Sequence, residues 1–129
     1  MKFSGAIDHV VTQYEVASGA IVHAVGSWAM AKGFGFRMCY TVNFENATAD
    51  YDLARGAEAL RLAVEGKPVQ VIDCGGSDGY VREMEHFVQA IRSGKPPTVV
   101  TCADGVSAVE ICEAEEKSVM SRTAVVLGG

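Results

Sequence analysis

The sequence predicts an α+β domain, a two-layer sandwich in which a largely antiparallel sheet of about six strands carries two helices on one face and leaves the other face open. Two observations predict this class. In the first half of the chain apolar residues alternate with a period of two, and in the second half they recur with the spacing of a helix face. The 129 residues suffice for one domain, which we take to span residues 1–129.

Six segments carry the strand pattern. They are residues 7–16, 20–28, 36–45, 47–53, 58–64 and 69–73. A turn at Ala17-Ser18-Gly19 makes the first two a hairpin. The third is the clearest strand, because five apolar positions from Phe36 to Phe44 alternate with mostly polar ones.

Two helices follow. The first is predicted over residues 80–94, with an apolar stripe of Tyr80, Met84, Phe87, Val88 and Ile91. Ser77 or Asp78 is expected to cap its start, and Gly94 to end it. The second helix is expected to begin at a capping Asp104, after a short extended piece at 99–101. Residues 121–127 are predicted to close the chain as a strand.

Composition and charge exclude several classes. Hydrophobic residues make up 49% of the chain and charged residues 21%, as in an ordinary folded domain. The net charge of −5 opposes nucleic-acid and anionic-membrane partners, and no run of 18 apolar residues is present. Because the N-terminus lacks the apolar core of a signal peptide, we expect a cytoplasmic protein.

The four cysteines do not form a metal-binding pattern. Cys39, Cys74, Cys102 and Cys112 lack C-x-x-C spacing, and no second histidine stands three to five residues from a first. We expect four free thiols in a reducing cytoplasm, with Cys39 and Cys112 packed as small hydrophobic side chains within apolar patterns. No metal site is predicted.

The first hairpin is apolar on both faces. Val11, Ile21 and Val25 alternate with Val10, Val16 and Val22 along the two strands. Two helices cover only one face of a sheet, so the other face requires a partner. A second copy of the chain is the simplest candidate, and a homo-oligomer joined through this open face is predicted.

Residues 28–37 are the strongest candidate for a binding site. They combine three aromatic and two cationic side chains on one connection: Trp28, Lys32, Phe34, Phe36 and Arg37. Such a set suits a small oxygen-rich ligand. The alternative is a loop anchored by a buried Trp28, with its charges in water.

Two further patterns have structural alternatives that we favour. Residues 74–79 join a strand to a helix and are rich in glycine, as in phosphate-binding loops. Their spacing matches neither G-x-G-x-x-G nor the P-loop, so a structural turn is the preferred interpretation. His9 and His23 could face each other across the hairpin and hold a metal or shuttle protons. Two partly exposed sheet residues are the simpler interpretation.

Several pieces of the chain, taken in order, resemble a known domain. They are the hairpin 12–28, the loop and strand 33–45, the strand ending at Tyr51-Asp52, the helix and turn 80–97, and the last helix with residues 123–127. Together they resemble the C-terminal α/β domain of the glucose–fructose oxidoreductase/inositol dehydrogenase/rhizopine-catabolism family. The resemblance covers about residues 7–127. Asn46-Ala47 departs from it, replacing a glycine-rich turn.

The resemblance implies a role within a larger enzyme. Members of this family transfer hydride between NAD(P) and a hydroxyl carbon of a sugar or cyclitol, and an N-terminal dinucleotide-binding domain holds the cofactor. That domain, its catalytic lysine and the family's catalytic Asp and His have no counterpart here, since Asp8 and His9 lie on a strand. The chain is therefore expected to supply a wall of the substrate pocket and the subunit contact. It is expected to hold no cofactor and to be inactive alone.

Two alternatives stay open. One is a stand-alone binding or scaffolding module that uses the fold without redox chemistry. The other is a small hydrolase or isomerase that uses His9 and His23. The reading frame upstream of Met1 would discriminate between a detached enzyme domain and a stand-alone module.

Overall fold

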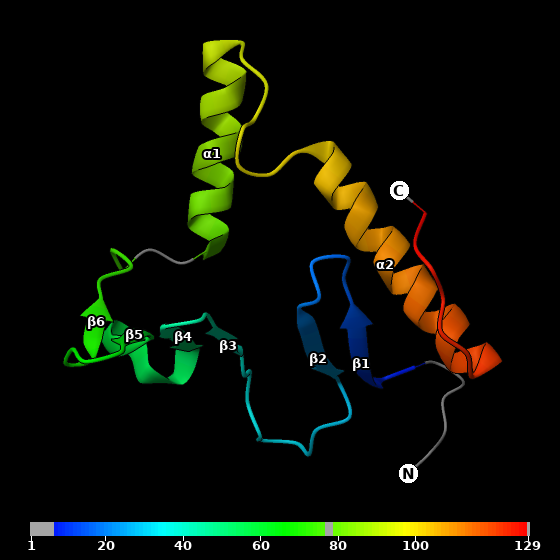
Figure 1. The fold of residues 1–129 in the computed structure, drawn as a ribbon. Coiled ribbons are helices and arrows are strands. Elements are labelled where there is room, and N and C mark those ends of the chain that lie inside the picture. The colour runs from blue at the N-terminus through cyan, green and yellow to red at the C-terminus, as the bar shows by residue number, and fades with distance from the viewer. Residues whose placement is uncertain (1–6, 77–78, 129) are drawn as a thin grey trace. The chain divides into compact units, whose positions relative to one another are not determined.

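The computed structural model describes residues 7–76 and 79–128 and shows a mixed α+β chain (Figure 1). The strands are β1 (His9–Glu15), β2 (Ile21–Ser27), β3 (Cys39–Asn43), β4 (Ala47–Asp52), β5 (Leu60–Val64) and β6 (Gln70–Ile72). The helices are the 3-10 helix η1 (Leu53–Glu58), α1 (Gly79–Ser93) and α2 (Cys102–Ser121). The six predicted strand positions and both predicted helices are confirmed.

The strands form two antiparallel sheets within the described residues. β1 pairs with β2, and β3, β4, β5 and β6 form a meander in that order. The chain divides into two compact units, one comprising Met1–Lys32 and Pro96–Gly129 and the other Gly33–Lys95. The hairpin and α2 belong to the first unit, and the meander and α1 to the second. The single six-stranded sheet stays a prediction.

In the first unit, half-buried and exposed side chains alternate along the first strand of the hairpin, as the sequence predicts. Gly19, with a φ of 81°, allows the turn, and the Gly19 N–H donates to the Val16 carbonyl at 2.8 Å. Along β1, Val10, Thr12 and Tyr14 are half-buried while the residues between them are exposed. The half-buried side faces α2, because Thr12 and Tyr14 hydrogen-bond to Glu115 of that helix.

In the second unit, the register gives the meander one apolar and one polar face. The apolar face carries Tyr40, Val42, Ala49, Tyr51, Leu60, Leu62 and Ile72. Tyr40 and Tyr51 stack across the strands with ring centroids 5.1 Å apart. Thr41, Asp50 and Arg61 lie in register on the opposite face, so only one side of this sheet requires an apolar cover.

Helix α1 leaves its apolar stripe in water. Tyr80, Met84, Phe87 and Ile91 are each more than half exposed, although they recur on one side of the helix. Ala59, at 7% exposure, is the one hydrophobic residue classed as buried in the described part of the chain. Most large apolar side chains of both units are therefore exposed in the described part of the chain.

Four local predictions need correction. Helix α2 is capped by Thr101, and Asp104 occupies the third helical position of a reciprocal capping box. Residues 123–128 follow the helix without forming a strand, and residues 99–100 are bends. β3 begins at Cys39 rather than Phe36, since Gly33 and Gly35 hold φ of 91° and 81° just before it. The expected caps Ser77 and Asp78 lie outside the described residues.

The cysteine prediction holds only in part. All four thiols are free, but all four are also exposed. Cys39 stands opposite Asp52 on the polar side of the meander, so it is not packed as a small hydrophobic side chain. Cys112 lies on an exposed face of α2.

Candidate functional site

The connection that follows β2 presents its aromatic side chains to solvent. Trp28 is 92% exposed and Phe36 is 75% exposed, and Phe34 is about half exposed. The alternative in which a buried Trp28 anchors the loop is therefore wrong. Exposed apolar side chains are common throughout the described part of this chain, so exposure alone does not single out this connection. The combination of aromatic and cationic residue types keeps it the leading candidate site.

Backbone contacts hold the start of this connection. The Trp28 N–H donates to the Asp8 carbonyl at 2.7 Å, and the Ala29 N–H donates to the Ser27 hydroxyl at 3.2 Å. These bonds fix the backbone beneath Trp28 while its indole ring stays exposed. A rigid base with a free aromatic face is a suitable platform for a flat apolar surface.

The cations of this connection have unused donors. Lys32 and Arg37 are exposed, and neither makes a hydrogen bond or ion pair with any residue in the described ranges 7–76 and 79–128. Trp28 and Lys32 belong to the first unit, while Phe34, Phe36 and Arg37 belong to the second. The five predicted site residues are thus divided between the two units.

The two strand histidines are not brought together. His9 lies opposite Ser27 and His23 lies opposite Gln13, four register positions away. At about 3.3 Å per residue, this separates their backbones by roughly 13 Å along the hairpin. Within the described residues no group of three or more His, Cys, Asp or Glu side chains could hold a metal ion. A joint metal or proton-transfer role for His9 and His23 is therefore unsupported.

The glycine-rich turn before α1 uses its own polar groups. The Asp73 carboxylate accepts the Gly75 N–H at 2.7 Å, and Arg82 donates to the Cys74 carbonyl. Gly75 and Gly76 have φ of 73° and 63°, which accounts for the glycines. An N–H that a phosphate would need is occupied by a carboxylate, which would also repel the phosphate. These contacts favour the structural turn.

A hydrogen-bonded cluster of Arg55, Asp50 and Thr41 on the meander, which we call the Arg55 bracket, was not predicted from the sequence. Arg55 of η1 donates to the Asp50 carboxylate at 2.6 Å and to the carbonyls of Asp50 and Ala59 at 3.0 Å. Thr41 donates to the same carboxylate from β3 at 2.8 Å. Arg55, and then Thr41, hold the pKa of Asp50 below its ordinary value of 3.8. The bracket closes the η1 turn and leaves the carboxylate already partnered, so we assign it a structural role.

A second polar contact joins distant parts of the first unit. The hydroxyls of Thr12 and Tyr14 both donate to one carboxylate oxygen of Glu115, the Thr12 bond at 2.7 Å. The hydrogen bond to Glu115 and, after it, partial burial raise the pKa of Tyr14 above its ordinary value of 10.0. Because 101 residues separate Tyr14 from Glu115, no local sequence signal could have paired them.

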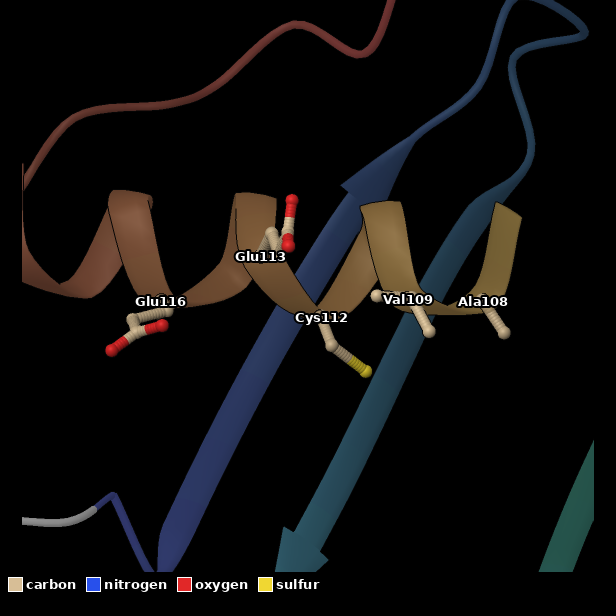
Figure 2. A pocket seen from close by; sticks show the side chains of 5 residues that line it. All are labelled: Ala108, Val109, Cys112, Glu113 and Glu116. Carbon is tan, nitrogen blue, oxygen red and sulfur yellow. The ribbon is translucent and has the colours of Figure 1, made fainter. Parts of the chain in front are cut away.

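Helix α2 also lines a shallow groove of 280 Å³ (Figure 2). Ala108, Val109, Cys112 and Glu116 lie on one side of the helix, and Glu113 is turned away from them. A thiol among carboxylates lacks the cationic neighbour that would activate it as a nucleophile. The groove therefore shows no catalytic arrangement.

Comparison with known proteins does not place the chain in a family. No family model, no curated protein and no solved structure matches it. In the described part of the chain, no helix combines the length and the apolar character that crossing a membrane requires.

Proposed function

We propose that this chain is the substrate-binding and oligomerisation domain of an NAD(P)-dependent oxidoreductase that acts on a hydroxyl of a sugar or cyclitol. The observation that carries the proposal is the exposed aromatic and cationic connection 28–37, with Trp28 and Phe36 open to solvent and Lys32 unpaired within the described residues. The ordered resemblance over residues 7–127 and the α+β composition are consistent with it. The proposed setting is the cytoplasm.

The side chains of this connection suit a polyol. An exposed indole or phenyl ring can stack on the C–H face of a pyranose or cyclitol, because that face is apolar. Lys32 and Arg37 carry only donors, which match the hydroxyl oxygens at the rim of such a ring. In this proposal Trp28 orients the substrate, and Lys32, which belongs to the same unit, selects its oxygen-bearing edge.

The residues of this chain do not fit the cofactor. Its one strand–glycine–helix turn has the wrong spacing for a dinucleotide, and Asp73 already occupies the Gly75 N–H. NAD(P) is therefore proposed to bind a separate dinucleotide-binding domain of the parent protein. The hydride acceptor and the proton acceptor would come from that domain, and no catalytic residue is assigned here.

The finer fold is also proposed: one six-stranded sheet with the helices on one face. The meander supports a helical layer on one face, because its apolar face measures about 19 by 17 Å, from four strands of about five residues. Helix α1 has 15 residues and is about 22 Å long, with an exposed apolar stripe. Its length and its stripe match the face that requires a cover.

The first experiment is binding and turnover with the chain and with the longer polypeptide that includes any dinucleotide-binding domain encoded upstream in the same reading frame. The longer protein should reduce NAD or NADP with a panel of sugars and cyclitols, while calorimetry of the chain alone with NADH should give no heat. Failure of the longer protein to oxidise any polyol would overturn the proposal. Polyol binding without cofactor-linked turnover would support the stand-alone binding module instead.

Within that longer protein, Lys32→Ala should weaken substrate affinity and spare cofactor affinity. Loss of one charge-assisted hydrogen bond costs about 1.5–3 kcal/mol, which is roughly a ten- to hundredfold rise in KM. Lys67→Ala is the matched control, since Lys67 is also exposed but lies in the turn after β5. Equal kinetics for the two variants would show that Lys32 is a solvated loop residue and does not bind the substrate.

The proposed partner is a second copy of the chain at the open sheet face. Val11, Ile21 and Val25 support this, because all three are more than half exposed on the side of the hairpin that faces away from α2. Light scattering at micromolar concentration should give at least twice the chain mass of 13.6 kDa. A monodisperse monomer would exclude this interface.

A further inference from the structure

We draw no further inference here: the strongest candidate, the half-exposed apolar face of the four-stranded sheet that carries Tyr40, Val42 and Tyr51, belongs to the sandwich already proposed, and nothing in the structure shows what else covers it.

Discussion

Replacing Tyr14 by Phe removes one of the two hydroxyl hydrogen bonds that join the β1–β2 hairpin to helix α2. The ring and its packing stay, so the variant tests the hydroxyl alone. Thr12 donates to the same oxygen of Glu115, so Thr12→Val removes the second donor with little change in shape. Both variants should loosen the attachment of α2 to the hairpin.

The size of the effect follows from the burial of the contact. A hydrogen bond to a charged acceptor contributes about 1.5–3 kcal/mol when it is well shielded. Tyr14 and Glu115 are only half-buried, so water competes, and we expect a loss of about 0.5–1.5 kcal/mol for Tyr14→Phe. Because the two hydroxyls share one acceptor oxygen, the two losses should not add, and the double variant should show coupling between them.

The pH dependence gives an independent test. The hydrogen bond to Glu115 favours the neutral phenol and raises the pKa of Tyr14 above 10.0. The stabilisation it provides is complete below pH 10 and is lost as the pH rises through the folded-state pKa. The difference in stability between wild type and Tyr14→Phe should therefore be constant near neutral pH and shrink in the alkaline range.

The assay is urea unfolding followed by far-ultraviolet circular dichroism, together with hydrogen exchange of the α2 amides. Tyr40→Phe is the matched control, because the Tyr40 hydroxyl makes no hydrogen bond to a residue in the described part of the chain and its ring stack remains. Equal unfolding midpoints for Tyr14→Phe and Tyr40→Phe, with unchanged exchange in α2, would refute the bridging role of Glu115.

Three further predictions concern the ends of α2. Thr101→Ala should destabilise the helix by about 1 kcal/mol, seen as faster exchange of its first-turn amides, because it removes the side chain that caps the Asp104 N–H. Hydrogen bonds from Thr101 lower the pKa of the Asp104 carboxyl. The stabilisation of the helix by the Asp104 carboxylate is therefore present above pH 3.8 and is lost as the pH falls through the lowered pKa. Asp104→Ala should weaken the acid dependence of the exchange of the first-turn amides. Arg122→Gly should stabilise the chain by about 0.5–1 kcal/mol in thermal unfolding, because Arg122 adopts a left-handed φ of 56°, whereas Arg122→Ala should give no gain.

The strands were predictable where alternation and turn chemistry agree. The hairpin through Gly19 and the β4 and β5 strands carry both signals, and each forms within two residues of its expected bounds. The closing segment 123–127 has the composition of a strand but forms none. A strand exists only when another strand supplies its hydrogen-bond partners, and no local pattern reports that partner.

At the candidate site, too, local sequence predicted the residue types but not their tertiary surroundings. Residue types marked the connection 28–37 as unusual, but they did not reveal whether Trp28 would be buried, and the structure leaves it almost fully exposed. The Glu115 contact and the Arg55 bracket were missed because their partners depend on register and on tertiary packing. Thr101 was missed as a cap because Thr and Asp are both good capping residues, and only the hydrogen-bond geometry decides between them.

The distribution of apolar surface constrains the proposed oligomer. The meander is apolar on one face only, since Thr41, Asp50 and Arg61 occupy the other, so a single helical layer would satisfy it. The hairpin has apolar residues on both faces and uses one of them against α2. Its outer face, two strands of about seven residues, measures roughly 10 by 24 Å, or about 240 Å². That is well below the roughly 800 Å² per partner of a stable interface. A homodimer held by the hairpin alone would therefore be weak. The proposed homodimer therefore has to bury surface beyond the outer hairpin face.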